Sequence, residues 1–290
     1  MVKKKKVDTN YQKQVEQIVQ EGYDYSDEEM KSVYSEQKKS LDDIEVIIGA
    51  MFIKYSIDGL LKMTAKEKAS VGIDKTLKTM GKNLGNSEVE KVTSILSSIY
   101  EETYHKNGFI LKQNFKIIKK EYVDNAVNTK FKGEMFSDRI WTNKADMIDK
   151  LHKGLVDCMN GNTTIDKLAR DIKNTFNTTA YDSQRLVHTE NARIQGQASV
   201  DIAVNTGINQ HMWSATLDDK TAEEDATLDG QIFDIDDTSA PEQPLHPNCR
   251  CCWINIPYKD WSPTERMDNT TKEVIDYKTY EQWKSDKNMD

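Results

Sequence analysis

The sequence predicts an α+β protein, in which a mainly helical N-terminal two thirds precedes a small antiparallel β module with a His/Cys motif. Apolar residues recur at helical spacing through about the first 207 residues, and only 13 Gly and 5 Pro interrupt the 290-residue chain. Short alternating segments rich in aromatic residues follow. A run of helices before a run of strands is typical of α+β proteins.

Composition excludes several protein classes. The chain is 37% hydrophobic and 30% charged, which excludes collagen-like, low-complexity and wholly disordered proteins. Its richest apolar run, at 44–61, contains Glu45, Lys54 and Asp58, so no membrane anchor is expected. The basic start has no apolar stretch behind it, so no secretory signal is expected either. Four Cys are too few for a disulfide scaffold, and we expect a soluble protein with reduced thiols.

Charge is distributed unevenly along the chain. Residues 201–290 hold 19 acidic and 8 basic residues, a net charge of −11 against −8 for the whole chain. Because binding to phosphates needs clustered cations, any DNA contact should come from the N-terminal two thirds. The candidates are the lysines at positions 3–6 and four lysines expected on one side of a helix at 115–131. The alternative is that all of these lysines are ordinary solvated side chains. The four are Lys112, Lys116, Lys119 and Lys120.

Three capping boxes predict helix starts in the N-terminal region. In each, a Ser or Thr precedes a Glu by three residues, so that the two side chains can satisfy free backbone amides. The first box opens a long helix to about residue 55, and the second opens another helix. The third opens a helix that stops at Asn107-Gly108. The apolar faces of these helices suit docking on a partner, either as a bundle or, as we slightly favour, as an arm that orders on binding. The boxes are Ser26/Glu29, Thr64/Glu67 and Ser87/Glu90.

Regularly spaced capping residues and stop sequences predict three more helices, at 143–159, 164–176 and 179–206. Asn143, Thr164 and Thr179 are the expected caps, and Asn-Gly or Asn-Thr-Gly sequences provide stops. The short connections between these helices predict a bundle. Cys158 should be a small buried hydrophobic residue within it.

The rest of the chain predicts three strands and a polar tail. Alternating segments at 210–216, 230–236 and 251–256 suit strands, and an acidic, Pro-rich loop lies at 237–247. Trp213 and Trp253 are expected to be core residues. The tail after 257 should contain one short helix at about 277–284.

The most informative local motif is His246-Pro-Asn-Cys-Arg-Cys251. On an extended segment, side chains two residues apart share a face, so Cys249 and Cys251 should converge while Cys252 points away. His246 could complete three ligands of the kind that zinc prefers, with Asp225 as a fourth from across the hairpin. The alternative is a set of small buried residues beside a loop histidine.

These residues resemble a known family. Residues 213–251 read W-x(4)-D-D-K-T-x(3)-D-x(2)-L-D-G and then P-L-H-P-N-C-R-C. This pattern resembles the phage Mu F-like, or phage head morphogenesis (minor head protein), family. The segments 136–141, 186–190 and 192–193 look like the family's helical stretch ahead of the cysteine motif. The motif positions outside the metal set are Glu190, Arg193, Trp213, Asp219, Asp229 and Gly230.

The resemblance implies a role and a domain organisation. It covers residues 135–256, which leaves a helical region at 1–134 for docking on a partner and a polar tail at 257–290. The family implies a minor capsid protein of a tailed bacteriophage, made in the bacterial host cytoplasm and placed in the head interior at the portal vertex. Its partners would be the portal protein, packaged double-stranded DNA and other head proteins. Its role would lie in head assembly, DNA packaging or DNA ejection.

Metal binding is suspected in the family, and His246, Cys249 and Cys251 occupy the matching positions. A fourth position, usually His or Cys, is Asp225 in this chain. A carboxylate is a harder ligand, so it should lower the affinity for zinc. Any bound zinc is expected to be structural, because a small sheet with few core residues benefits from such a link.

Glu190 and Arg193 lie three residues apart on a predicted helix. The simpler interpretation is an intrahelical ion pair that contributes a few tenths of a kcal/mol, roughly. Alternatively, Glu190 orients a ligand or anchors the helix against the cysteine hairpin. The resemblance makes the Thr189-Glu190 pair part of the family pattern without giving it a chemical role.

A metal-dependent hydrolase or nuclease is the alternative function. It would use His246, Cys249 and Cys251 with the acidic residues of the hairpin, since carboxylates around a cation can support hydrolysis. However, the sequence has no phosphate-binding loop and no Ser/His/Asp pattern. Some longer relatives append toxin or transferase domains after the cysteine motif, and the 39 residues after Cys251 are too few for one. We therefore expect no enzyme. The acidic residues are Asp218, Asp219, Glu223, Glu224, Asp225 and Asp229.

Overall fold

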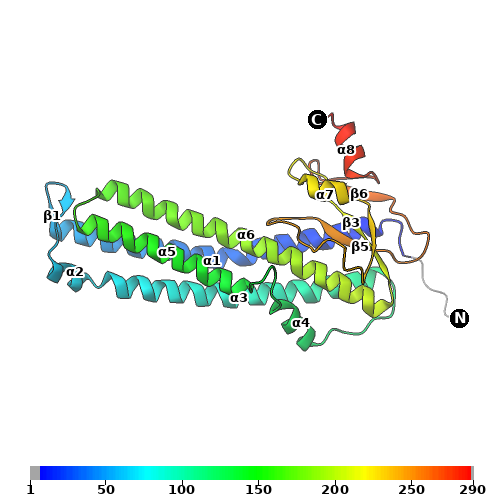
Figure 1. Ribbon diagram of the computed structural model, residues 1–290, viewed down its shortest axis with the longest axis horizontal. Coiled ribbons are helices and arrows are strands. Elements are labelled where there is room, and N and C mark those ends of the chain that lie inside the picture. The colour runs from blue at the N-terminus through cyan, green and yellow to red at the C-terminus, as the bar shows by residue number, and fades with distance from the viewer. Residues whose placement is uncertain (1–6, 289–290) are drawn as a thin grey trace. The chain divides into compact units, whose positions relative to one another are not determined.

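The computed structural model describes residues 7–288 and confirms the α+β prediction (Figure 1). Within this range, none of the helices is long and apolar enough to span a bilayer. The helices are α1 (Tyr11–Tyr55), α2 (Ala65–Val71), α3 (Ile73–Ile110), α4 (Lys120–Val127), α5 (Phe136–Met159), α6 (Ile165–Thr206), α7 (Glu223–Leu228) and α8 (Tyr280–Asp286). The strands are β1 (Ser56–Ile57), β2 (Leu60–Leu61), β3 (Gln210–Ser214), β4 (Ile232–Asp234), β5 (Cys252–Asn255), β6 (Glu265–Asp268) and β7 (Glu273–Asp276).

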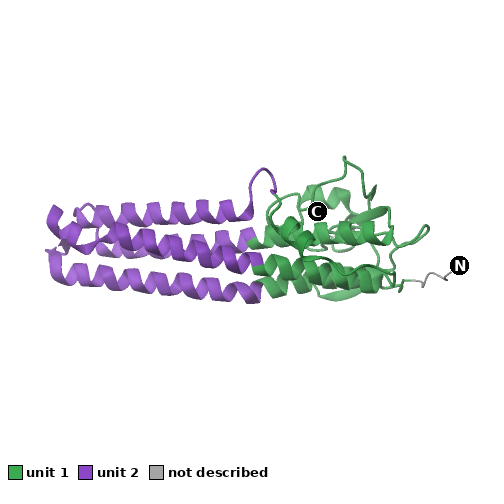
Figure 2. Ribbon diagram, turned by 90° about the horizontal axis from the view of Figure 1, so that it is seen from below, with its two compact units in different colours: residues 1–26, 94–129, 187–290 green, residues 27–93, 130–186 purple. Residues whose placement is uncertain are grey.

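The chain divides into two compact units, each assembled from segments distant in sequence (Figure 2). The bundle unit comprises residues 27–93 and 130–186. The sheet unit comprises residues up to 26, 94–129 and 187–290. Helices α1, α3 and α6 each contribute residues to both units.

The bundle unit is built from α5 and the parts of α1, α3 and α6 that belong to it. Its core joins apolar residues of all four helices with the β1–β2 hairpin, whose Leu61 is buried. Ile44, Ile48 and Met51 of α1 are buried there, so in this structure the N-terminal helix packs in a bundle, the first of the two expected arrangements. Cys158 is buried in this core, as predicted.

A buried polar layer crosses the bundle unit, with one residue from each of four helices. Lys144 of α5 lies 2.5 Å from Glu88 of α3, and the two side chains are 2% and 1% exposed. Gln37 of α1 donates hydrogen bonds to Glu88 (3.5 Å) and to Ser183 of α6 (3.3 Å). Because a buried charge is costly without its partner, this layer fixes which helix faces meet at this level.

Several predicted helix starts are wrong because the polar residue lies inside a longer helix. Ser26 is in the middle of α1, where its hydroxyl donates to the carbonyl of Tyr23 (2.8 Å). Thr179 likewise donates to the Thr175 carbonyl (2.9 Å) within α6, and Ser87 lies within α3. Ser and Thr can bond to the preceding turn in this way, so a capping pattern alone does not end a helix. Thr64 does form the predicted capping box with Glu67.

Two other predicted helices have different bounds. The helix expected at 115–131 is reduced to α4, because residues 113–119 are irregular. Helix α5 begins at Phe136 rather than at Asn143, since the Asp138 carboxylate accepts a hydrogen bond from the Met135 amide (3.3 Å). The predicted stops near Asn160 and Gly207 are confirmed.

The sheet unit contains two small antiparallel sheets. The first has the order β4-β3-β5, and its three strands are those predicted from the sequence. In its register Trp213 lies opposite Trp253, and both are buried, as predicted. The second is the β6–β7 hairpin, which lies where a polar tail with one short helix is predicted. The short helix predicted in the tail is confirmed as α8.

We predict that the bundle depends on the polar layer. Replacing Lys144 with Met leaves the buried Glu88 carboxylate unpaired and should lower the free energy of unfolding by about 3–5 kcal/mol. The double variant Lys144→Met/Glu88→Leu should recover most of this loss. Urea denaturation followed by circular dichroism measures both.

The matched control is Lys31→Met, which removes an exposed pair with Glu28 (2.5 Å). This change should cost less than about 1 kcal/mol. A Lys144→Met loss no larger than that of the control would show that the layer contributes nothing specific.

Candidate functional site

The structure brings three of the four predicted metal ligands together. Asp225 lies on α7, whereas Cys249 and Cys251 precede β5 in the cysteine loop, which we define as residues 243–251. One ligand atom from each residue lies within 4.8 Å of the other two, and the thiol of Cys249 is 3.4 Å from Asp225 Oδ1. The three residues are only 1–3% exposed, so the cluster is closed to solvent.

His246 lies beside this cluster and contacts one of its members, Asp225. Its Nε2 is 2.6 Å from Asp225 Oδ2, and its Nδ1 is 2.9 Å from the Pro247 carbonyl oxygen. Burial alone would lower the pKa of His246, but these two hydrogen bonds raise it above the ordinary value. His246 therefore pairs with the carboxylate that would be the third ligand.

The two thiols of the cluster differ in acidity. The Cys251 thiol donates to Cys249, which lowers the pKa of Cys249 and, together with burial, raises that of Cys251. Cys249 is thus the first of the two to become a thiolate, the form that binds metals. Cys252 does not join the cluster, as predicted. Its burial near Glu16 raises its pKa.

Helices α1 and α6 hold the cysteine loop. The Tyr23 hydroxyl of α1 donates to the Cys249 carbonyl (2.8 Å), and the Asn248 amide donates to the hydroxyl of Thr189 on α6 (3.2 Å). The side-chain amide of Gln243 donates both to the Ala192 carbonyl (3.1 Å) and to the Cys251 carbonyl (3.0 Å). The positions of both cysteines are therefore set by contacts with helices rather than by the loop alone.

Glu190 and Arg193 form the predicted ion pair, but the pair is buried. Arg193 Nε lies 2.6 Å from Glu190 Oε2, and the two side chains are 8% and 1% exposed. Arg193 also donates to the Ala126 carbonyl of α4 (2.9 Å). The pair therefore connects α6 to α4, a larger role than that of a surface pair.

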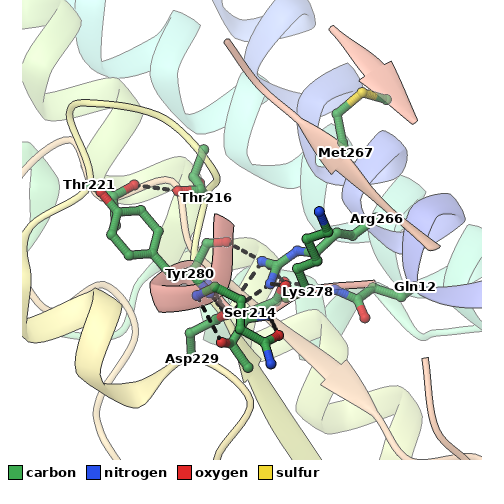
Figure 3. A network of polar contacts seen from close by, with 12 residues as sticks. Gln12, Ser214, Thr216, Thr221, Asp229, Arg266, Met267, Lys278 and Tyr280 are labelled. Carbon is green, nitrogen blue, oxygen red and sulfur yellow. Dashed lines mark hydrogen bonds and ion pairs between the residues drawn. The ribbon is translucent and has the colours of Figure 1, made fainter. Parts of the chain in front are cut away.

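Asp229 is the centre of a second buried network (Figure 3). Its Oδ2 lies 2.8 Å from Arg266 Nη1 of β6, and both side chains are 1% exposed. Its Oδ1 accepts a hydrogen bond from the Ala215 amide after β3 (2.7 Å), and Oδ2 accepts one from the Tyr280 amide at the start of α8 (2.7 Å). One carboxylate thus links β3, β6 and α8.

Arg266 extends this network. Its guanidinium donates to the carbonyls of Ala215 (2.5 Å) and Lys278 (2.8 Å). Its Nε lies 3.8 Å from Glu16 Oε1 of α1, and Glu16 Oε2 accepts from the Met267 amide (2.8 Å). Burial raises the pKa of Glu16, although the nearby Arg266 lowers it in part. The network therefore also ties α1 to β6.

Gly230 fits the turn that follows Asp229. Its φ is +80°, a conformation that favours glycine, and an added Cβ would lie 3.1 Å from the Tyr277 hydroxyl. Its amide donates to the Trp213 carbonyl (2.9 Å), and the Trp213 amide donates to the Gln231 carbonyl (2.9 Å). The Asp-Gly pair of the motif thus has a structural explanation.

The acidic residues of the predicted hydrolytic site are not assembled around one point. Asp218 pairs with Arg250 (2.6 Å), and Asp229 is engaged by Arg266. Asp219 is exposed, as are Glu223 and Glu224 in the first turn of α7. Asp225 is the carboxylate of this set that joins the cysteines.

The predicted phosphate-binding lysines do not share a helix face. Lys112 follows α3 and forms an ion pair with Asp8 (2.6 Å). Lys116 and Lys119 lie in the irregular segment, and Lys120 begins α4. The lysines at 3–6 lie outside the described residues.

Sequence reasoning missed three residues that hold the site: Arg266, Gln243 and Tyr23. Arg266 was assigned to the tail, although residues 265–276 read as two short alternating segments around Asp-Asn-Thr-Thr-Lys. That pattern could have indicated the β6–β7 hairpin. No local signal marks Tyr23 or Gln243, because each contacts residues distant in sequence.

We predict that Asp229 is required for the stability of the sheet unit. Asp229→Asn weakens the buried pair with Arg266 and should cost about 3 kcal/mol, which lowers the melting temperature by roughly 6–12 °C. The control Asp219→Asn makes the same charge change at an exposed motif position and should leave the melting temperature within roughly 2 °C. Equal melting temperatures for the two variants would contradict this role.

Comparisons with known proteins agree with the motif. The model of the family described as Phage Mu protein F like protein matches residues 149–254, which include α6, strands β3 and β4, the cysteine loop and all but the last residue of β5. The chain is also 20% identical, over 297 aligned residues, to the minor head protein GP7 of Bacillus phage SPP1. This alignment covers 90% of the chain and 96% of that protein.

Two other relatives are longer than the matched region. The chain is 26% identical over 227 residues to a protein of Enterococcus faecalis named NAD(+)--arginine ADP-ribosyltransferase EFV, with 70% of the chain and 46% of that protein covered. It is 28% identical over 121 residues to an uncharacterized protein of Haemophilus influenzae, with 40% and 26% covered. The chain thus spans about half and about a quarter of these two relatives. No solved structure was found to match the chain.

The motif, the sheet that carries it and these matches support a role in phage head morphogenesis. Residues 149–254 of this chain are therefore similar to the family described as Phage Mu protein F like protein.

Proposed function

We propose that the chain is a minor, non-enzymatic component of a tailed-phage head that associates with the portal vertex and is present in the virion. The observation that carries this proposal is the similarity to a minor head protein along 90% of the chain and 96% of that protein. Because both are covered almost completely, the likeness extends beyond the cysteine motif. The chain spans 46% of the Enterococcus relative, so the transferase activity in that protein's name describes that longer protein.

The chemistry of the sheet unit supports a structural role. Asp229, Arg266 and Glu16 are occupied by one another and by backbone groups, so none is presented to a substrate. Asp225, Cys249 and Cys251 are buried. A reacting group must be reachable from solvent, whereas a link between segments need not be.

DNA contact is the second part of the proposal. A protein at the portal vertex lies next to the packaged double-stranded DNA, and a role in packaging or ejection brings it into contact with phosphates. Lys116, Lys119 and Lys120 are exposed and can contribute, whereas Lys112 is engaged by Asp8. Such contacts are independent of base sequence and weaken steeply with salt.

We further propose that the cysteine loop binds one structural zinc ion. Two thiols and a carboxylate lie within 4.8 Å of one another, and this donor set suits zinc. Cys249, Cys251 and Asp225 would hold the ion, and His246 is placed beside Asp225 to complete the set. The ion would link α7 to the cysteine loop, a connection that otherwise depends on hydrogen bonds.

Zinc binding is predicted at about one ion per chain. Equilibrium dialysis against zinc followed by elemental analysis should show loss of the ion in Cys249→Ser and Cys251→Ser. Asp225→His should bind zinc more tightly, because imidazole is a better zinc ligand than a carboxylate. Cys158→Ser is the control, since that buried thiol lies in the bundle unit. A wild-type chain without zinc, or equal loss in Cys158→Ser, would rule out the site.

Particle composition tests the head proposal. Phage deleted for this gene and supplied with the wild-type chain should yield gradient-purified particles that contain the chain in a few copies, as measured by quantitative mass spectrometry. Comparing full particles with emptied ones shows whether the chain leaves with the DNA. Asp219→Asn should be incorporated normally and Asp229→Asn poorly, because only the second disrupts the sheet unit. Particles that lack the wild-type chain would refute the proposal.

A further inference from the structure

One end of the bundle unit is basic, whereas the rest of the unit is acidic. At one end α1 and α5 finish while α3 and α6 begin, and we define this basic end as residues 46–82 and 150–174. It includes ten residues from each of these helices and the connections between them. The basic end holds 12 Lys and Arg against 6 Asp and Glu, whereas the rest of the unit holds 9 against 14. The basic end therefore carries a net charge of +6, and the rest of the bundle unit carries a net charge of −5.

Contacts across the connections show that these segments form one end. The Met63 amide donates to the Met159 carbonyl (3.3 Å), and Lys68 hydrogen-bonds to Asn160. His152 of α5 lies 2.9 Å from Asp74 of α3. The charges of all four helix ends are therefore combined in one region.

Most cations of the basic end are available to a partner, although Lys68 hydrogen-bonds to Asn160 and Lys54 lies over the Tyr55 ring. Eleven of the twelve are exposed, and within residues 7–288 none of the twelve forms an ion pair with Asp or Glu. Two of the acidic residues are engaged locally, Glu67 by the Thr64 amide (2.8 Å) and Asp74 by His152. By contrast, Lys91 and Lys144 elsewhere in the unit pair with glutamates.

The cations are also grouped by helix face. Lys75, Lys78 and Lys82 are spaced i, i+3, i+7 and share one side of α3. Lys167, Arg170 and Lys173 follow one side of α6, and Lys150 with Lys153 follow α5. A partner with regularly repeated negative charge can meet several of these groups at once, which a single acidic side chain cannot do.

We propose that the basic end of the bundle unit is a binding surface for double-stranded DNA. Duplex DNA carries one negative charge per about 1.7 Å of its axis, so it matches a surface whose cations are spread over several helices. The inference rests on the proposed function, because packaged DNA is the polyanion present in a phage head. It assigns the main DNA contact to this end rather than to the lysines at 112–120.

The test compares two triple variants with the same loss of charge. Lys75→Gln/Lys78→Gln/Lys82→Gln removes the α3 face of the basic end, whereas Lys31→Gln/Lys38→Gln/Lys39→Gln removes three exposed lysines of α1 outside it. Binding of the full chain to a fluorescein-labelled duplex of random sequence is measured by anisotropy over a series of salt concentrations. Circular dichroism confirms that both variants are folded.

The first triple should reduce the slope of log affinity against log salt by about 2–3, because each phosphate contact contributes about 0.9. The second triple should leave the slope within about 1 of the wild type. A third variant, Lys116→Gln/Lys119→Gln/Lys120→Gln, should also have a smaller effect than the first.

Equal slopes for the first two triples would overturn the proposal, as would a wild-type chain that fails to bind DNA at low salt. Binding to vesicles of phosphatidylcholine and phosphatidylserine without binding to DNA would identify a membrane surface instead and also overturn it. Particle composition is independent of these outcomes. A chain that is present in particles but does not bind DNA would refute this inference and leave the head role intact.

Discussion

The sheet unit depends on the buried pair of Asp229 and Arg266. Strands of three to five residues bury little apolar surface, so the module needs another source of order. The carboxylate supplies it by accepting backbone amides from the segment after β3 and from the start of α8, while the guanidinium donates to two carbonyls. Because an unpaired charge in this position would be costly, the segments are held in one arrangement.

The same network, together with a second ion pair, determines which carboxylate lies beside the thiols. With Asp229 engaged by Arg266 and Asp218 by Arg250, the acidic hairpin retains Asp225 as the carboxylate beside the thiols. Tyr23 and Thr189 then fix the cysteine loop to α1 and α6. The Asp-Gly and Cys-Arg-Cys segments of the motif therefore connect elements distant in sequence.

The sequence predicted the elements better than their connections. Periodicity located the three strands at 210–256, and side-chain alternation placed Cys249 beside Cys251. Helix boundaries failed at Ser26, Ser87 and Thr179, because these polar residues lie within long helices, and Ser26 and Thr179 bond to the preceding turn. Arg266 could not be connected to Asp229 from spacing alone, since the two are 37 positions apart in the chain and Arg266 lies in a separate hairpin. The packing of α1 in a bundle also could not be predicted from the sequence, because it depends on which apolar helix faces meet in the tertiary structure.

We propose that the chain works as part of a phage head beside the portal. Cross-linking mass spectrometry on intact purified particles tests it most directly, because it reports both presence and neighbours. We expect cross-links between lysines of this chain and the portal protein, at a low abundance that matches a minor component. Particles in which the chain is absent, or in which it cross-links to the outer shell and never to the portal, would refute this location.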